Sequence, residues 1–377
     1  MTREFDNKIK TFRDSIDRID RQILELISQR LDQVEKVVAL KKTHNIPVYH
    51  PAREEDLISK LRSQASGTGV DPEFIEEMYR VILRNSRLRQ TGQMKQKGIR
   101  PGARVLMVGG GGQMGQFFSA MFCSSGYEVT ILGENDWENA EELCKGTDLV
   151  LICVPINVTL ETIQRIAPFV PPTAILADIT SIKQGPVNEM LEQFKGPVMG
   201  LHPLFGPSCS TLDKQLIAVV PGRNNNACQW LLDQLTLWGA IVVGSTAREH
   251  DEIMDIVQAL RHFATFCFGQ FLCERNIKLE RSLEFSSPIY RLEIGMVGRL
   301  FAQSGNLYSE IIFATPDRRR LLKEYVASIN DQIALVDNND KTLFEQRFAE
   351  IAHWFGPFSE QAMGESDFII DKLIERF

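Results

Sequence analysis

Hydrophobic residues recur every three or four positions through the first 90 residues of the chain. The first such seam predicts a long amphipathic helix reaching about Lys42, with Phe5, Ile9, Phe12, Ile16, Ile19, Ile23 and Leu26 on one face. A single helix of about 40 residues needs a partner to bury that face. Two shorter helical patterns follow, from Ala52 to Gln64 and from Pro72 to Thr91. Residues 1–90 therefore predict an all-helical domain.

The pattern changes after a polar segment, rich in Gly and Lys, that predicts an interdomain linker over 91–103. Short apolar runs follow, mostly separated by helical stretches, at 104–108, 128–132, 148–154, 174–179, 198–201, 217–220 and 241–243. Strands alternating with helices predict an α/β, Rossmann-type domain with a doubly wound parallel sheet over 104–245. Residues 246–377 are helical again, with long patterns at 250–276 and 288–302, and predict an all-α C-terminal dimerisation and substrate-site domain.

Composition agrees with an ordinary globular protein, since 44% of the 377 residues are hydrophobic and 24% are charged. The first 22 residues are charged throughout, and the sequence has no run of about 18 uncharged apolar residues. We therefore expect a cytoplasmic protein that does not span a membrane. The seven cysteines form no CxxC pair, which favours buried free thiols over a disulfide framework and predicts no metal site.

Charge is distributed unevenly along the chain. The formal net charge is −7, yet residues 1–100 carry 20 Lys and Arg against 15 Asp and Glu, so this segment is at +5 and the rest at −12. A basic segment could serve nucleic acid or a small polyanion. Because its cations fall on the helix seam instead of forming an exposed stripe, we expect no nucleic-acid partner.

A glycine loop directly follows the first predicted strand and contains GxGxxG as Gly110, Gly112 and Gly115. These glycines allow a tight turn, close approach of a pyrophosphate and close packing of helix on strand. The helix that begins with Gln113 and Met114 offers free N–H groups to phosphates. The strand before and the helix after the motif make a chance glycine loop a poor explanation. We predict a dinucleotide site.

The choice of nucleotide depends on the end of the second predicted strand. Glu134 lies about 20 residues after the loop, where an acidic residue hydrogen-bonds the ribose hydroxyls. Gly133 could occupy the usual position of that acidic residue, but no Arg follows at once to receive a 2′-phosphate. NAD is therefore favoured over NADP. After the third strand, Val154 and Pro155 would place backbone beside the nicotinamide half.

Candidate catalytic groups follow the fourth and fifth predicted strands, where ligands of open α/β sheets bind. His202 lies in GLHPLFGP and could accept a proton from a substrate hydroxyl while the carbon bearing it loses hydride. Ser181 could orient the imidazole, and Lys183 could either act in the site or cap the next helix. Arg291 and Arg299 lie in an apolar helical stretch; pairing with a nearby Glu is a second reading of Arg291, and Arg299 is the preferred carboxylate clamp.

A second cluster of cations lies in the N-terminal helices. Arg30 falls on the hydrophobic seam, and Lys41, eleven residues later, returns to within about 20° of the same face. Arg13 lies about 100° around the helix from Arg30 and could serve a different groove, for instance across a dimer. A helical dimerisation module with solvated charges is the alternative interpretation.

These residues together resemble the family of bifunctional chorismate mutase/prephenate dehydrogenases along nearly the whole chain. The stretches that carry the resemblance are RxxIDxID, PAREE, VGGGGQMG, GLHPLFGP, SSPIYRLE and VGRLFAQ. The resemblance implies an intertwined helical dimer that rearranges chorismate to prephenate without a cofactor. It also implies NAD-dependent oxidation of prephenate to 4-hydroxyphenylpyruvate with loss of CO2, in tyrosine biosynthesis.

The resemblance also implies roles for individual residues. Arg30 and the Arg13 of a partner subunit would bind the carboxylates of chorismate, and Lys41 and Gln90 would donate to its ether oxygen. Glu54 would bind a hydroxyl, with Arg53 and Ser86 completing the wall; His50 stands where some relatives have Asp. In the dehydrogenase, His202 would accept a hydrogen bond from the ring hydroxyl, supported by Ser181, and Arg299 would bind the ring carboxylate. Tyrosine would inhibit, with His262 a candidate for that response.

Two other functions fit parts of the pattern. One is a single-activity dehydrogenase of the β-hydroxyacid or imine-reducing type, whose N-terminal helices only dimerise. The other is a regulatory protein that senses NAD with an inactive Rossmann domain. Mutase turnover tests the first alternative, and NADH production from prephenate tests the second.

Overall fold

The computed structural model describes residues 3–44, 46, 50–94, 97–209 and 211–374. The chain forms two compact units. The first comprises residues 1–154 and 158–247, and the second comprises residues 155–157 and 248–377. Each unit is described by itself.

Three helices open the first unit: α1 (Arg3–His44), α2 (Pro51–Ser66) and α3 (Pro72–Met94). Both short helices begin with proline after a capping residue, because the first helical N–H needs no partner and proline already has a helical φ. The His50 ring accepts a hydrogen bond from the N–H of Arg53 at 3.2 Å, and the Asp71 carboxylate accepts one from the N–H of Glu73 at 3.0 Å. The local sequence thus fixes where α2 and α3 start.

Helix α3 extends beyond its predicted end near Thr91 and runs to Met94, inside the segment predicted as linker. Thr91 is fully buried, and the following Gly92 continues the helix. A single glycine costs a helix only about 1 kcal/mol relative to alanine, which tertiary packing easily outweighs. The polar composition of this segment was therefore a poor guide to the helix boundary.

A seven-stranded sheet follows, in the order β2-β1-β3-β4-β5-β6-β7. Its strands are β1 (Arg104–Val108), β2 (Glu128–Leu132), β3 (Leu149–Ile152), β4 (Ile175–Asp178), β5 (Val198–Pro203), β6 (Leu216–Arg223) and β7 (Ile241–Gly244). Each predicted apolar run forms a strand, and the predicted Rossmann-type fold class is confirmed. The strand order reverses at β1, because β2 pairs with one edge of β1 and β3 pairs with the other.

The prediction of a wholly parallel sheet is wrong for two strands. Strands β1 to β5 are parallel, but β6 runs antiparallel to β5, and β7 is parallel to β6. Parallel neighbours need a crossover connection, usually a helix. In the described part of residues 204–215, between β5 and β6, no helix forms, so the chain turns back beside β5.

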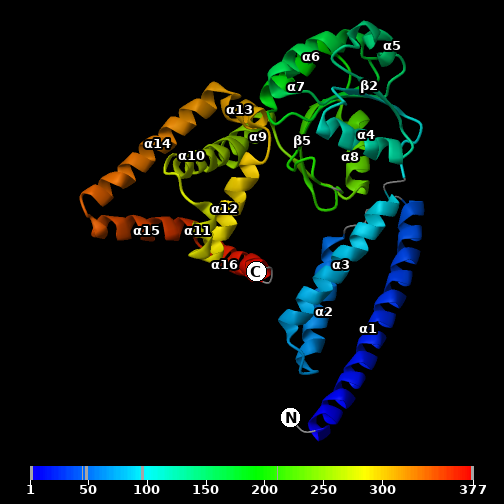
Figure 1. The fold of residues 1–377 in the computed structure, drawn as a ribbon. Helices are drawn as coiled ribbons and strands as arrows, with labels where there is room; N and C mark the ends of the chain where they lie inside the picture. Colours follow the sequence, from blue (N-terminus) through cyan, green and yellow to red (C-terminus); the bar gives the residue numbers. More distant parts are fainter. Residues whose placement is uncertain (1–2, 45, 47–49, 95–96, 210, 375–377) are drawn as a thin grey trace. The chain divides into compact units, whose positions relative to one another are not determined.

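Helices cover both faces of this sheet, and Figure 1 shows α4 and α8 on one side with α6 and α7 on the other. The strand residues alternate between two buried clusters, one including Val105 and Met107 and the other Leu106 and Val108. The covering helices are α4 (Gln113–Ser124), α5 (Ala140–Cys144), α6 (Thr159–Ile166), α7 (Gln184–Gln193) and α8 (Asn225–Leu237), with short 3-10 turns η1 (Trp137–Asn139), η2 (Ile156–Val158) and η3 (Ala167–Phe169). Near-continuous burial of the inner strands follows from this two-sided cover.

The second unit is helical, as predicted. Its helices are α9 (Ala247–Met254), η4 (Asp255–Leu260), α10 (Arg261–Glu274), α11 (Leu279–Glu284), α12 (Pro288–Phe301), α13 (Gly305–Phe313), α14 (Pro316–Asp337), α15 (Lys341–Phe355) and α16 (Phe358–Ile374). The predicted helix over 250–276 is interrupted by η4, which has π-helical hydrogen bonding. The buried Arg318 donates to Asp255 at the start of η4, at 2.8 Å.

Within the described ranges, every helix is too short or too polar to cross a bilayer. All seven cysteines are free. The expected burial holds for Cys144 and Cys228, is partial for Cys153 and Cys209, and is wrong for Cys123, Cys267 and Cys273, which are exposed.

Candidate functional site

The glycine loop connects β1 to α4 by a tight turn. Gly109 has φ = +80°, a conformation that glycine adopts without strain, and its carbonyl oxygen accepts from the N–H of Gly112 at 3.1 Å. Gly112 is the N-cap of α4 and makes no side-chain capping bond, so no N-cap side chain occupies the N–H groups of the first turn. The N–H groups of that turn, including those of Gln113 and Met114, are those that an anion would use.

Steric limits explain the glycines at the two ends of the motif. A Cβ on Gly115 would lie 2.7 Å from the Cα of Gly110, and a Cβ on Gly110 would lie 2.9 Å from the Cβ of Met107. Neither position has room for a side chain, whereas Gly111 has no atom within 4 Å of its Cβ position. This close packing of loop, strand and helix fits the cradle that a dinucleotide pyrophosphate requires.

The loop lies at the point where the strand order reverses. A Cβ on Gly109 would lie 2.6 Å from Cγ1 of Val154, so the residues after β1 and β3 are adjacent. Val154 is half-buried and Pro155 is exposed. Ligands of open α/β sheets bind at such a switch point, beyond the carboxyl ends of the strands.

The end of β2 contains an acidic residue that the sequence prediction missed. Glu134 is exposed in the turn after β2, but it is the carboxylate of Asp136 that folds back and accepts from the N–H of Gly133 at 3.0 Å. An acidic residue three positions after a strand-ending glycine is a turn signal that could have indicated it. Two carboxylates, from Glu134 and Asp136, therefore lie near the expected ribose position.

His202 and Ser181 lie at the carboxyl ends of two neighbouring parallel strands. His202 is the penultimate residue of β5 and is only 2% exposed, whereas Ser181 lies half-buried in the turn between β4 and α7. The register pairs Asp178, the last residue of β4, with Gly200 of β5. The carboxyl ends of both strands thus bring these two side chains to the same edge of the sheet, which β3 and β1 also share.

The N-terminal helices bring several predicted mutase residues together. The Arg30 guanidinium on α1 donates to the Ser86 hydroxyl on α3 at 2.8 Å, and Ser86 in turn donates to the carbonyl oxygen of Ile82 at 2.9 Å. Gln90, one turn after Ser86, is half-buried. The cation on the hydrophobic seam therefore faces α3.

Lys41 lies near Glu54 on α2. Burial lowers the pKa of Lys41, and the nearby negative charge of Glu54 partly opposes that shift. The Glu54 carboxylate accepts from Arg87 of α3 at 2.6 Å, and both side chains are largely buried. Arg87 was not predicted from the sequence; its position next to Ser86 was the available signal.

Two other predicted mutase residues are exposed. Arg53 pairs with Asp56 on the same helix at 2.9 Å, and its side chain is 67% exposed. Arg13 is exposed on α1. His50 caps α2. Neither arginine contacts the Arg30–Ser86 pair through a hydrogen bond among the residues that the structure describes.

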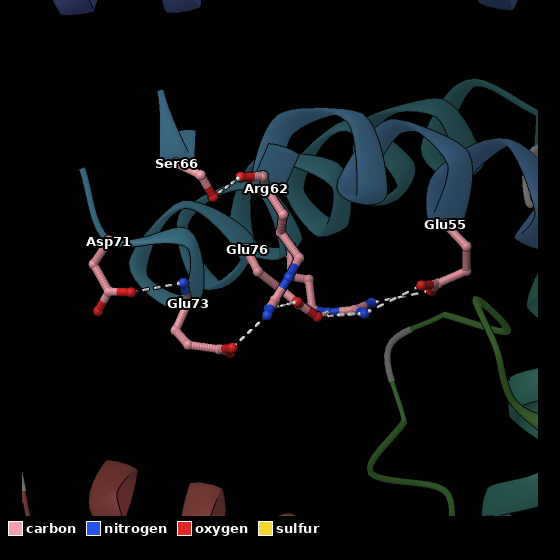
Figure 2. Close-up of polar contacts among 7 residues, drawn as sticks. Glu55, Arg62, Ser66, Asp71, Glu73 and Glu76 are labelled. Atoms are coloured by element: carbon pink, nitrogen blue, oxygen red, sulfur yellow. Dashed lines mark hydrogen bonds and ion pairs between the residues drawn. The ribbon is translucent and has the colours of Figure 1, made fainter. Parts of the chain in front are cut away.

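An ion-pair network joins α2 to α3, as Figure 2 shows. Arg62 of α2 binds Glu73 and Glu76 of α3, and Arg80 of α3 binds Glu76 at 2.6 Å and Glu55 of α2 at 3.2 Å. The hydrogen bond from Arg62 lowers the pKa of Glu73. This network fixes the helix that carries Glu54 against the helix that carries Ser86.

In the second unit, the two predicted arginines of α12 differ in their surroundings. Arg291 donates to the carbonyl oxygen of Leu283 at 2.7 Å, and Arg299 is exposed. The His262 ring packs edge-on against Tyr308 with 4.8 Å between centroids. Burial, with a contribution from Arg261, lowers the pKa of His262 to about 4. Among described residues, no group of three His, Cys, Asp or Glu could hold a metal ion.

Three family models match successive parts of the chain. They describe chorismate mutase type II at residues 12–91, the prephenate dehydrogenase nucleotide-binding domain at 124–242, and the prephenate dehydrogenase dimerization domain at 246–350. A T-protein of Enterobacter agglomerans is 40% identical over 95% of this chain and 96% of its own length. A T-protein of Haemophilus influenzae is 38% identical over 96% of both chains.

Solved structures resemble about two thirds of the chain. A crystal structure of prephenate dehydrogenase from A. aeolicus, in complex with hydroxyphenyl propionate and NAD+, covers 67% of this chain and 97% of that one, with a TM-score of 0.53 and 16% identity. A Synechocystis arogenate dehydrogenase covers 67% and 99%, with a TM-score of 0.50 and 16% identity. At these identities the likeness concerns the fold.

Proposed function

This chain belongs to the T-protein family, and from that membership we infer that one polypeptide carries two activities. It rearranges chorismate to prephenate, and it oxidises prephenate with NAD to 4-hydroxyphenylpyruvate and CO2, in tyrosine biosynthesis. One observation carries this conclusion: relatives match over 95% of the chain, across both the mutase helices and the dehydrogenase domains. The assignment of individual residues below is our proposal.

For the mutase, we propose that Arg30 binds the substrate and that Lys41 stabilises the transition state. The rearrangement breaks a C–O bond, so negative charge builds on the ether oxygen, and a fixed cation or N–H donor lowers the barrier. Lys41, partly desolvated, and Gln90 would supply those donors. Arg30 would bind a carboxylate of chorismate, with its guanidinium oriented by Ser86 at 2.8 Å.

Three further residues are assigned to the mutase pocket: Glu54, Arg53 and Arg13. Glu54 would accept a hydrogen bond from a substrate hydroxyl, and Arg87 holds its carboxylate in place. Arg53 would have to leave its surface pair with Asp56 to reach the substrate; such exposed pairs are worth at most about 1 kcal/mol. Arg13 is separated from Arg30 by 17 residues, or about 25 Å along a helix.

That separation favours a dimer in which Arg13 serves the pocket of the partner subunit. The hydrophobic seam of α1 gives a second argument, because Phe12 is 68%, Ile16 56% and Leu26 63% exposed, whereas Val38, beside the continuation of the seam, is 2% exposed. The neighbouring helices therefore leave most of the seam uncovered. A second copy would bury this uncovered part, and the match to a dimerization domain in the second unit supports the same homodimer.

For the dehydrogenase, we assign the proton acceptor to His202. The ring hydroxyl of prephenate would donate to the neutral imidazole, and its proton would move to that nitrogen as the carbon is oxidised. Loss of CO2 and formation of the aromatic ring drive the step. Ser181 would hold the imidazole, and Arg299 would bind the ring carboxylate, with Arg291 a further substrate contact.

The cofactor is NAD, which supplies the hydride acceptor when bound. The residues present fit it: Gly110 and Gly115 let the loop pack closely against β1 and α4, and Gly112 leaves the start of α4 without a side-chain cap where the pyrophosphate would bind. We propose that Glu134 binds the ribose hydroxyls, with Asp136 shaping the turn. Inhibition by tyrosine, a role for His262 in it and a cytoplasmic location remain predictions from the sequence.

Kinetics of the full chain test the proposal. Given chorismate and NAD, the wild type should convert chorismate and then produce NADH; His202→Asn should lose only the oxidation and Arg30→Ala only the rearrangement. Absent mutase turnover would favour a single-activity dehydrogenase, and absent NADH production from prephenate would favour an NAD-sensing protein. Loss of both activities in either folded variant would count against two separate sites.

A further inference from the structure

A buried lysine stands beside the strand that carries His202. Lys183 is the N-cap residue of α7, and its side chain, like that of Asp178, has no solvent exposure. The Lys183 ammonium binds the Asp178 carboxylate and donates to the carbonyl oxygen of Leu201 at 2.8 Å. The side chain makes no capping bond at α7, so helix capping does not explain it.

Stability alone does not account for this ion pair, because removing two charges from water costs about as much as their attraction returns, or more. The ion pair lies instead beside residues of the proposed dehydrogenase site. Asp178 pairs with Ile152, the last residue of β3, in the strand register. Burial and the negative charge of Asp178 raise the pKa of the neighbouring Cys153 thiol. The ion pair thus sits at the same sheet edge as the proposed dehydrogenase site.

Strand register explains what the ammonium does there. The ladder between β4 and β5 ends at the pair Asp178–Gly200, while β5 continues to Pro203. Leu201 is therefore the first residue beyond the ladder, and the Lys183 ammonium hydrogen-bonds its carbonyl oxygen in place of the β4 backbone. A buried carbonyl without a partner would be costly.

Gly200 makes room for this arrangement. A Cβ there would lie 3.0 Å from Cδ of Lys183 and 2.7 Å from Cγ2 of Val187. The stem of the lysine can therefore run along β5 only because position 200 has no side chain. The peptide group that receives the ammonium is the one that joins Leu201 to His202.

We propose that Lys183, held by Asp178, is a positioning residue for His202. By fixing the Leu201 peptide, it sets the place from which the imidazole accepts the substrate proton. The ammonium is buried and does not bind substrate. This inference rests on the role proposed above for His202.

The test uses the full chain with Lys183→Met and Asp178→Asn combined, so that no unpaired charge is left buried. Asn keeps an acceptor for the N–H of Thr180, which donates to Asp178 at 2.9 Å. We expect the dehydrogenase kcat to fall about 100-fold, as misplacement by about 1 Å can do, with KM for prephenate and NAD changed by less than about threefold. The mutase activity of the same sample should be unchanged. Lys195→Met, at an exposed lysine after α7, is the matched control.

A kcat within about threefold of wild type would overturn the proposal, as would a raised KM at unchanged kcat, which indicates a binding role. If the double variant does not fold, Lys183→Gln takes its place, with kcat expected to fall at least about tenfold at unchanged KM. His202→Asn is measured in parallel. Full oxidation by that variant would overturn the role of His202 itself, whereas its inactivity beside a fully active double variant would overturn only the role of Lys183.

Discussion

Replacing Gly115 with alanine would place a methyl group against the backbone of the glycine loop. The new Cβ would lie 2.7 Å from the Cα of Gly110 and 3.0 Å from the carbonyl oxygen of Gly109. Carbon atoms in van der Waals contact stay at least about 3.5 Å apart, so the helix and the loop would have to separate by about 0.8 Å. Both neighbours are main-chain atoms, and no side-chain rotation can relieve the clash.

The expected magnitude follows from that displacement. Overpacking of this kind costs about 1–3 kcal/mol, and here it moves the first turn of α4 away from the loop that completes the phosphate cradle. Since about 1.4 kcal/mol corresponds to a tenfold change in affinity, the Kd for NAD should rise about 10- to 100-fold. The N-terminal helices are not touched by the change, so chorismate turnover should stay at the wild-type level.

Titration of NAD, followed by protein fluorescence, measures this effect, and mutase activity of the same sample confirms folding. Gly111→Ala is the control, because its Cβ meets no atom within 4 Å and its φ is not in the left-handed region. It should leave NAD affinity within about threefold of wild type. Equal NAD affinity in Gly115→Ala and wild type would refute the reasoning, since the nucleotide would then not depend on the contact between loop and α4.

Three further predictions follow from other parts of the chain. Burial lowers the pKa of Lys41, so mutase activity should decline with rising pH at a lower pH than that at which an ordinary lysine loses its proton. The residual activity of Lys41→Arg should lack that decline, and a pH profile of this variant equal to that of the wild type would contradict the assignment. Arg62→Gln should lower Tm most above pH 4.5, because the Arg62 hydrogen bond that lowers the pKa of Glu73 stabilises the folded protein only while Glu73 is ionised, and this stabilisation is lost as pH falls. A difference in Tm between variant and wild type that stays constant down to pH 3 would contradict this prediction. Gly269→Ala would push a Cβ into the Phe301 ring of α12 and should destabilise the second unit by about 1–3 kcal/mol, whereas Gly295→Ala, with no atom within 4 Å, should stabilise it by about 0.5–1 kcal/mol in chemical unfolding. The opposite order would show that α10 and α12 do not pack as described.

Element types were predictable because local patterns determine them. Each apolar run between turn residues became a strand, and the seam from Phe5 to Leu26 became one face of α1. The direction of each strand was harder to predict, because an apolar run indicates that a strand is buried but not which way it runs in the sheet. The sequence between β5 and β6 lacks a helix pattern, and that absence was the only local signal that β6 turns back.

The candidate dinucleotide site was largely predictable for the same reason. The glycine motif, the helix after it and the strand before it are consecutive in sequence, so Gly110, Gly112 and Gly115 could be placed before any fold was known. Asp136 was missed because its carboxylate reaches Gly133 only when the turn after β2 closes. Sequence distance alone favoured Glu134.

The role of Lys183 could not be predicted from the sequence alone. Two readings of this residue, a group of the active site and a helix cap, were equally compatible with its position after β4. What separates them is that β4 ends at Asp178 while β5 runs on past Gly200, which leaves the Leu201 carbonyl within reach of the lysine at 2.8 Å. Register between two strands that lie 20 residues apart depends on packing of the whole sheet and not on either segment. The positioning of His202 is therefore a property of the folded sheet, and its test requires changing residues that never touch the substrate.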